Sequence, residues 1–530
     1  MGDGEGAALP HRRLGVTENA DEEQSWSERD VRGVELRAVC VHFGVSADRF
    51  EILLGPLLAL GCARQQVQPL LEQAWSRLQL LRERLIDVRA GLSELASAQL
   101  ERAEASLNTP SGTSLNAVAN SLDSAFDVCT SSSASDEDAA SLRALQGLAA
   151  AVAFDFCRAA TLSGEAATMA QADAEASWHY RVQQAEFLLD QGRERNDVES
   201  LQALTRLCES TLLPMASANR AQAERAWVHD CLGQALGILG RQQSGTAALD
   251  QAVNAFEAAL ELRDRDRSPY DWAATQNHLG NAMGSLGQRQ QSLELLERSA
   301  AAFEAALEVP VSNAAPEGRA SAQSNLAAVL QTLGQQKKDA ELLERAVAAY
   351  KSALSTWTSD RKPLFWAATQ ANLGSALRLL GGVREDSGAL EQSVAAYRAA
   401  LSARTRERMP HEWALSQNDL GAALQALGEL TGDVLTFGRS IAAYRDALKE
   451  LTREGEPMTW AMTTANLGVA RRKLAEDTDD VDVSRRAVAD IQSALEVFRG
   501  ASHARMTELG LEQLAIAMEV NAELESAAQD

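Results

Sequence analysis

A fixed repeat of 47 residues constrains this chain more than any other feature of its sequence. The leucine of an Asn-Leu-Gly-like element recurs at this interval, at Leu232, Leu279, Leu326, Leu373, Leu420 and Leu467. A second marker in the later half of each unit keeps the same interval, at Phe256, Phe303, Tyr350, Tyr397, Tyr444 and Ile491. Because two independent markers share one period, the region from about residue 225 to the C-terminus consists of repeats.

The first half of a unit predicts an amphipathic helix. In the unit that begins at Trp366, Leu373, Leu377 and Leu380 follow the i, i+4, i+7 spacing of one helix face. Gly381 comes directly after this stripe, and glycine suits the left-handed position that ends many helices. The first helix is therefore expected to end at Gly381.

The second half of the unit predicts another helix. A polar loop is expected from Val383 to Gly388, and a second apolar stripe runs from Leu390 to Leu401. Proline is expected to mark the turn before each next first helix, at Pro363, Pro410 and Pro457. A helical hairpin that is apolar on one stripe cannot bury that face alone, so neighbouring units must stack. The predicted fold is all-α: an α-solenoid of antiparallel helix pairs, preceded by an N-terminal helical or coiled-coil region.

The repeat resembles the tetratricopeptide repeat (TPR) family. Leu373-Gly374 matches the Leu-Gly pair of that family, and Ser393, Tyr397 and Ala400 match its A-x3-F-x2-A pattern. The unit is longer than the family's 34 residues or so, and is most similar to long bacterial units of the "WAxTQNNLGNAL" type and more distantly to kinesin light chain repeats. The resemblance covers roughly residues 178 to 524, and it implies a scaffold for protein–protein interaction rather than an enzyme.

The rest of the chain divides around these repeats. Residues 136–224 read as degenerate repeats, since Trp178 lies two periods before Trp272. Leu514 lies one period after Leu467, so a capping helix is expected in the final segment. The expected parts are a disordered N-terminus (1–28), an N-terminal helical region (29–135), degenerate repeats (136–224), six regular repeats (225–504) and a C-terminal capping helix and tail (505–530).

A heptad-like apolar seam occupies the N-terminal region between Pro69 and Leu107. Its members alternate steps of three and four residues: Leu71, Ala74, Leu78, Leu81, Leu85, Val88, Leu92 and Leu95. The pattern fits two arrangements. One is a coiled coil with a second chain, which makes a homodimer through residues 69–107; the other is an intramolecular hairpin packed on residues 115–126.

Charge and composition weigh against several functional classes. The formal net charge is −24, which opposes binding to nucleic acid or to an anionic membrane. Residues 36–54 superficially resemble a helix-turn-helix, but Asp48 and Glu51 oppose the single Arg49 in the would-be recognition helix. No apolar run reaches the length of a membrane helix and the N-terminus has no signal-peptide pattern. The six cysteines show no C-x2-C spacing, so a cytoplasmic protein with reduced thiols is expected.

No motif predicts catalysis. The sequence has no Gly-rich phosphate loop, no G-x-S-x-G and no H-E-x-x-H. We expect no enzymatic activity, no cofactor and no metal. The recurrent tryptophans, such as Trp366 and Trp413, lie on the leucine stripe of each first helix, which favours packing over a ligand-binding box.

The candidate site is the non-core face of the first helices, which should line the concave groove of a solenoid. This strip is small and amide-rich, and amides can donate to and accept from a peptide backbone. The resemblance adds that an Asn before the Leu-Gly pair commonly holds ligand backbone, as Asn325, Asn372 and Asn466 are placed to do. The candidates are His278, Asn281, Asn325, Gln331, Asn372, Ser375, Arg378, Asn418, Asp419, Gln425, Asn466, Arg472 and Lys473.

These residues lead to one main functional hypothesis and leave alternatives open. The hypothesis is a non-enzymatic scaffold whose groove binds a peptide or helix of another protein. The alternatives are a regulatory or sensor subunit of a bacterial signalling or defence system, with the N-terminal helices dimerising or contacting an effector, and a DNA-binding regulator that uses residues 36–54. The groove amides have a structural alternative too, in which they bridge adjacent helices.

Overall fold

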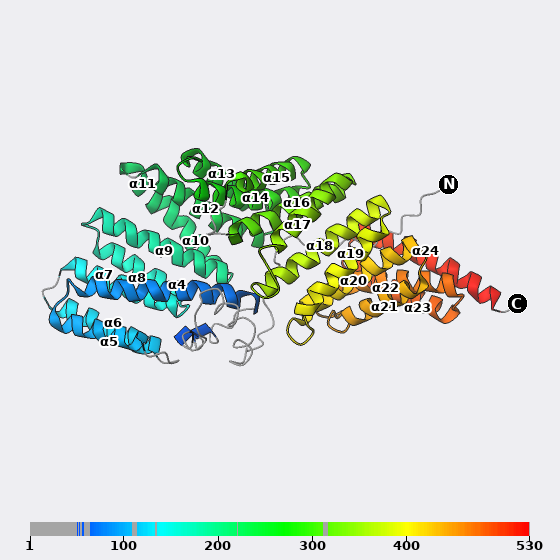
Figure 1. Ribbon diagram of the computed structural model, residues 1–530, viewed down its shortest axis with the longest axis horizontal. Helices are drawn as coiled ribbons and strands as arrows, with labels where there is room; N and C mark the ends of the chain where they lie inside the picture. The colour runs from blue at the N-terminus through cyan, green and yellow to red at the C-terminus, as the bar shows by residue number, and fades with distance from the viewer. Residues whose placement is uncertain are drawn as a thin grey trace. The chain divides into compact units, whose positions relative to one another are not determined.

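The fold is described from a computed structural model that covers residues 50, 52–53, 56–57, 64–108, 114–132, 135–219, 221–310 and 316–528. All regular secondary structure in these residues is helical (Figure 1). The chain divides between Pro310 and Val311 into two compact units. We call the described residues up to Pro310 the N-terminal unit and those from Pro316 onward the C-terminal unit.

Helices account for nearly the whole of each unit. The N-terminal unit contains α4 (Arg64–Arg89), α5 (Glu94–Asn108), α6 (Ser114–Ser131), α7 (Asp136–Val152), α8 (Phe156–Met169), α9 (Ala174–Glu194), α10 (Val198–Leu207), the π-helix η2 (Cys208–Leu212), α11 (Leu213–Asn219), α12 (Gln222–Gln242), α13 (Ala247–Leu262), α14 (Pro269–Gln290) and α15 (Leu293–Glu308). The C-terminal unit contains α16 (Pro316–Lys337), α17 (Ala340–Leu354), α18 (Pro363–Arg384), α19 (Ser387–Ala403), α20 (Pro410–Thr431), α21 (Val434–Ala447), α22 (Pro457–Thr478), α23 (Val481–Gly500) and α24 (Ala504–Ala527).

The predicted α-solenoid of helix pairs is confirmed. Each first helix packs on its own second helix, as in α12 with α13 and α18 with α19. Each second helix then contacts the first helix of the next pair, as in α13 with α14 and α19 with α20. The period is set at the helix ends, where five first helices of 22 residues begin on a proline: Pro269, Pro316, Pro363, Pro410 and Pro457. Proline suits this first position because its missing N–H would be unpaired there in any case.

The prediction that Gly381 ends the first helix was wrong. Helix α18 continues to Arg384, and Glu385 takes the left-handed conformation, with φ 53°. Gly381 lies inside the helix, where a Cβ atom would come within 2.7 Å of the Leu390 side chain. Gly240 and Gly334 hold the same position in two other repeats and lie similarly close to a leucine of the paired helix, so a glycine at this position serves close helix packing. The expected loop from Val383 to Gly388 shrinks to two residues.

An aspartate makes this short turn possible. Asp386 accepts hydrogen bonds from the backbone N–H groups of Gly388 and Ala389, at 2.8 and 3.3 Å, and so caps the start of α19. The same position is filled at 47-residue intervals by other N-cap residues: Ser292, Asp339, Asp433 and Asp480. In these five repeats, only two residues separate the end of the first helix from the start of the second.

The recurrent aromatic residue forms the core of each pair. Tyr444 is fully buried, and its ring lies against Gly421, where a Cβ would approach within 2.8 Å. Ser440 donates a hydrogen bond of 2.8 Å to the Gly421 carbonyl oxygen, which links α21 to α20. The same serine–glycine bond recurs between Ser393 and Gly374 and between Ser299 and Gly280.

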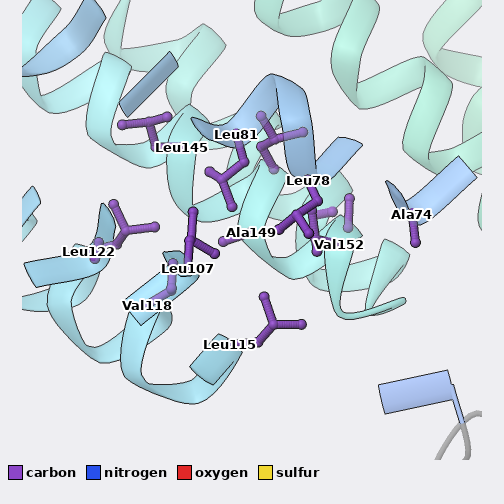
Figure 2. Packing of buried hydrophobic residues seen from close by; sticks show 14 of the residues in the cluster. Ala74, Leu78, Leu81, Leu107, Leu115, Val118, Leu122, Leu145, Ala149 and Val152 are labelled. Atoms are coloured by element: carbon purple, nitrogen blue, oxygen red, sulfur yellow. The ribbon is translucent and has the colours of Figure 1, made fainter. Parts of the chain in front are cut away.

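The N-terminal helices form a bundle around the apolar seam (Figure 2). Leu78 and Leu81 of α4 lie in one cluster with Leu107 of α5, Val118 of α6 and Ala149 of α7. Leu71, Ala74 and Leu85 are buried in the same cluster. Helices of the same chain therefore bury the seam, which agrees with the intramolecular arrangement. It is also shorter than expected: α4 ends at Arg89, and Leu95 on α5 is 72% exposed.

Some sequence expectations fall on other parts of the chain. Residues 1–28, which were expected to be disordered, and almost all of the helix-turn-helix-like stretch 36–54 lie outside the described residues. In the region of degenerate repeats, α9 occupies the first-helix place with Trp178 buried. Its second helix is interrupted, because α10 passes into the π-helix η2 and then α11.

Candidate functional site

The predicted strip lies on the first helices, and its members differ in accessibility. Nine of the thirteen residues keep exposed surface, Asn372 the most: His278, Asn281, Asn325, Gln331, Asn372, Ser375, Arg378, Asp419 and Lys473. The other four are buried: Asn418, Gln425, Asn466 and Arg472, at 0, 2, 3 and 5% exposure. Those four side chains are therefore out of reach of a partner in this structure.

Three of the strip residues hold the buried tyrosines of their own repeat. The hydroxyl of Tyr350 donates to Gln331 at 3.3 Å, and that of Tyr444 donates to Gln425 at 3.2 Å. In the repeat between them, Arg378 hydrogen-bonds to Tyr397. A buried hydroxyl needs a partner, so this strip position has a structural role in each of these repeats.

Neighbouring first helices of the C-terminal unit are joined by strip residues as well. Gln331 of α16 donates a hydrogen bond of 3.0 Å to Ser375 of α18. This contact agrees with the alternative interpretation of the strip, in which its amides bridge adjacent helices. Asn372 lies one turn before Ser375 on α18, and its side chain is exposed.

The end of the strip is a charged cluster on α20 and α22. Arg472 and Lys473 both pair with Glu476, the latter at 3.3 Å, and Gln425 donates to Glu429 at 3.0 Å. Glu429 keeps exposed surface, but partial desolvation raises the pKa of its carboxyl, while the hydrogen bond from Gln425 and the charges of Lys473 and Arg472 act in the opposite direction. Arg472 and Lys473, two of the predicted strip residues, are thus already paired with Glu476 of the same helix.

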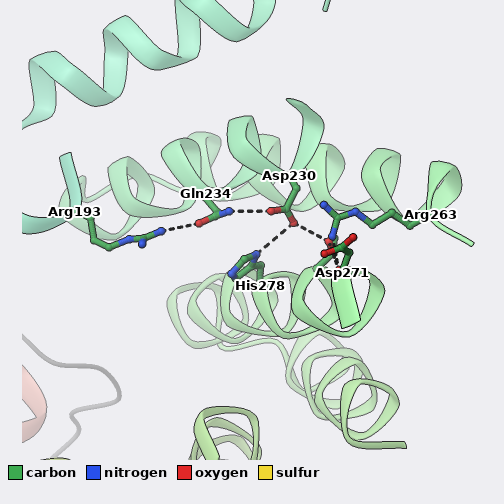
Figure 3. A network of polar contacts seen from close by, with 7 residues as sticks. Arg193, Asp230, Gln234, Arg263, Asp271 and His278 are labelled. Carbon is green, nitrogen blue, oxygen red and sulfur yellow. Dashed lines mark hydrogen bonds and ion pairs between the residues drawn. The ribbon is translucent and has the colours of Figure 1, made fainter. Parts of the chain in front are cut away.

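The N-terminal unit holds a network that the sequence reasoning missed (Figure 3). Asp230 of α12 is 6% exposed and accepts hydrogen bonds from Thr275 at 2.8 Å and from Gln234 at 2.8 Å. The His278 ring nitrogen Nδ1 lies 3.3 Å from the same carboxylate. Gln234 in turn accepts a hydrogen bond of 2.7 Å from Arg193 of α9. The network links three successive first helices, α9, α12 and α14.

The surroundings of Asp230 keep it ionised. Burial alone raises the pKa of this carboxyl, but the hydrogen bond and charge of His278, the charge of Arg263 and the hydrogen bond from Thr275 outweigh it, and the pKa is lowered. One signal for this site existed in the sequence. Asp230 has the same repeat position as Asn418, four repeats later. Thr275 and His278 follow Asp230 by 45 and 48 residues, and Thr463 and Asn466 follow Asn418 by the same numbers of residues.

We expect Asp230→Asn to lower the free energy of unfolding by about 1–3 kcal/mol at pH 7, because a buried, hydrogen-bonded charge is lost. A lowered pKa stabilises the fold above the ordinary value of 3.8, and this contribution disappears as the pH falls through the folded-state pKa. The difference in free energy of unfolding between wild type and variant should therefore become smaller below about pH 3.8. Urea denaturation at several pH values measures this difference, and Asp250→Asn, at an exposed aspartate, is the control. A difference that does not change with pH would contradict a stabilising role for the ionised Asp230 carboxylate.

The recurrent tryptophans serve the joints between repeats. The guanidinium of Arg265 lies 4.9 Å from the Trp272 ring, and Arg406 lies 5.8 Å from Trp413. Arg265 also pairs with Glu308 at 2.9 Å, a residue of the next repeat's second helix. These ring faces contact arginines of the protein itself, as a packing role requires.

The described part of the chain contains neither a membrane-spanning helix nor a metal-binding cluster. No helix there is long and apolar enough to cross a membrane. Within the same residues, no group of three or more His, Cys, Asp or Glu side chains is arranged to hold a metal ion.

The repeat units match a known family. The sequence profile described as "Tetratricopeptide repeat" matches residues 272–310 and 319–356, which correspond to the pairs α14–α15 and α16–α17. These two units are therefore repeats of the tetratricopeptide type. The pairs α12–α13, α18–α19, α20–α21 and α22–α23 follow in the same 47-residue register. The unit exceeds the usual length of about 34 residues by about 13, and 22-residue first helices take up much of the difference.

Comparison with solved structures gives only loose superpositions. BtubC (BKLC) from P. vanneervenii is 20% identical with a TM-score of 0.32, over 46% of this chain and 88% of that one. A Rap protein in complex with competence and sporulation factor is 13% identical with a TM-score of 0.34, over 73% and 99%. Human IFIT1 with m7Gppp-AAAA is 13% identical with a TM-score of 0.31, over 86% and 95%. No curated protein matches the sequence.

Proposed function

We propose that this repeat protein is a non-enzymatic cytoplasmic scaffold that binds a segment of another protein along the first-helix strip of its C-terminal unit. TPR folds generally serve protein interaction, and the reachable part of the strip has suitable chemistry. The observation that carries the proposal is the exposed amide of Asn372, with partly exposed Asn325 one repeat before it and Asp419 one repeat after it.

These side chains suit a polypeptide better than a small polar ligand. An Asn amide can donate to a backbone C=O and accept from a backbone N–H at the same time. Contacts at corresponding positions of successive first helices let one extended or helical segment bind several repeats at once. The described residues supply no observation that favours the regulatory or DNA-binding alternatives.

A photo-crosslinking experiment tests this proposal. We expect benzoylphenylalanine placed at Asn372 to form a specific crosslink to a partner protein in cells, because the side chain is exposed on the strip. The matched control carries the same probe at Glu391, which is exposed on second helix α19. Adding Asn325→Arg to the Asn372 probe should reduce the crosslink at least tenfold. Equal crosslinking from both probe sites, or no effect of Asn325→Arg in a folded chain, contradicts the proposal.

A further inference from the structure

Among the described residues, no second helix follows α24, whereas every other first helix of the regular repeats packs on one. Helix α24 packs on α22 and α23, with Met506, Gly510 and Ala517 buried on that side. Leu514 lies one period after Leu467, so α24 occupies a first-helix place. In the other repeats, the face opposite this contact is covered by the second helix of the same unit.

The register identifies that uncovered face residue by residue. Ala515 and Ala522 of α24 lie one period after Gly468 and Ala475 of α22. Gly468 packs so closely on α23 that a Cβ would come within 2.6 Å of Ile491, and Ala475 is fully buried. On α24, by contrast, both corresponding alanines are exposed.

Two larger apolar side chains complete the face. Leu511 is 43% exposed and Met518 is 53% exposed. Residues 511, 515, 518 and 522 follow i, i+4, i+7, i+11 spacing, so they form one stripe along the helix. We call these four residues the α24 stripe. Its small residues leave room for a second helix to approach as closely as α23 approaches α22.

Acidic residues border the α24 stripe. Four exposed glutamates lie beside it on the helix surface: Glu508, Glu512, Glu519 and Glu523. Arg505 is the only basic residue within α24. A second copy of the same helix would bring like charges together, which opposes association, whereas a helix flanked by Lys or Arg would be attracted.

We propose that the α24 stripe binds an amphipathic helix of another protein, which carries a matching apolar stripe flanked by Lys and Arg and takes the place of a second helix. This surface includes no residue of the first-helix strip, so the proposal is independent of the proposed function. The bound helix would complete the repeat that α24 begins.

The test uses the full-length chain and two synthetic helical peptides. Both copy the apolar residues of the chain's own second helix α19; one has Lys and the other Glu at its outward polar positions. Fluorescence anisotropy should show saturable binding of the Lys peptide, weakened by salt, and at least tenfold weaker binding of the Glu peptide. Equal binding of the two peptides, or binding of neither, overturns the proposal.

Variants separate the stripe from general attraction to an acidic protein. Leu511→Glu and Met518→Glu add negative charge, so non-specific attraction of the Lys peptide would rise, but loss of the stripe should weaken binding at least tenfold. The control is Leu435→Glu on α21, a site that is 71% exposed, which should bind as wild type does. Unchanged binding by Met518→Glu overturns the proposal. A wild-type dimer in sedimentation velocity that Met518→Glu abolishes also overturns it, since the stripe would then bind a second copy.

Discussion

Tyr444→Ala is expected to lower the free energy of unfolding by about 3–5 kcal/mol, the largest effect we predict for a single side chain of the repeats. The ring of Tyr444 is fully buried between α20 and α21, against Gly421. Because glycine leaves no side chain to move into the space, the pair can collapse only partly around the cavity. The loss should also leave Gln425 without its hydroxyl partner.

The destabilisation caused by Tyr444→Ala should be confined to the repeats near residue 444. Repeat units contact mainly their neighbours, so hydrogen exchange should lose protection in α20, α21 and α22 before it does so in α16. Tyr444→Phe is the matched control: it keeps the ring and loses only the hydrogen bond to Gln425, at a cost of about 1–3 kcal/mol. Equal destabilisation by the two variants would show that the hydroxyl, and not the ring, stabilises this pair.

Arg77→Met is expected to destabilise the N-terminal unit by about 3–5 kcal/mol at pH 7. The Arg77 guanidinium pairs with buried Asp190 and lies 5.0 and 5.7 Å from the Phe156 and Phe187 rings. Through this contact α4 of the bundle is joined to α9. Methionine keeps much of the apolar contact with the rings, but it leaves two acidic groups, Asp190 and Glu186, without the cation.

The pH dependence of this variant follows from Glu186. Glu186 keeps exposed surface, but partial desolvation raises the pKa of its carboxyl, the charge of Asp190 raises it further, and Arg77 acts in the opposite direction. Without Arg77 the folded-state pKa should rise more. A raised pKa stabilises the fold below the ordinary value of 4.5, and this contribution is lost as the pH rises through the folded-state pKa. The loss in free energy of unfolding caused by Arg77→Met should therefore be smaller at pH 4 than at pH 7.

Two controls separate the ion pair from other effects of the change. Arg102→Met removes an exposed arginine from α5 and should alter stability by less than about 0.5 kcal/mol. The double variant Arg77→Met with Asp190→Leu removes both partners and should recover much of the loss, since a buried pair can be replaced by apolar groups at little cost. A double variant no more stable than Arg77→Met would rule out the unpaired Asp190 carboxylate as the cause.

The sequence predicted the repeat fold better than it predicted the ends of the helices. The period, the helix pairs and the buried aromatic series from Phe256 to Tyr444 all follow from residue spacing. Gly381 was interpreted as a helix end because glycine suits a left-handed turn. In the structure Glu385 takes that conformation, and Gly381 is needed where Leu390 of the paired helix packs against it.

The candidate site was predicted only in part, for a similar reason. Asn372 and Asn466 occupy the same place in two repeats, yet one is exposed and the other is 3% exposed. A repeated sequence position specifies which face of its helix a side chain lies on. How deeply it is covered depends on the side chains that the adjacent helices place over it, which the local pattern does not contain.

The sequence by itself determined that the chain from about residue 225 onward is a series of 47-residue helix pairs, because each helix has its own apolar stripe and the spacing of that stripe is visible in the local sequence. Only the tertiary structure decided which strip amides are exposed, that Asp230 joins Thr275 and His278, and that no described helix covers the α24 stripe. The physical reason is that burial and pairing of a side chain belong to contacts between helices far apart in the chain, whereas helix formation is local.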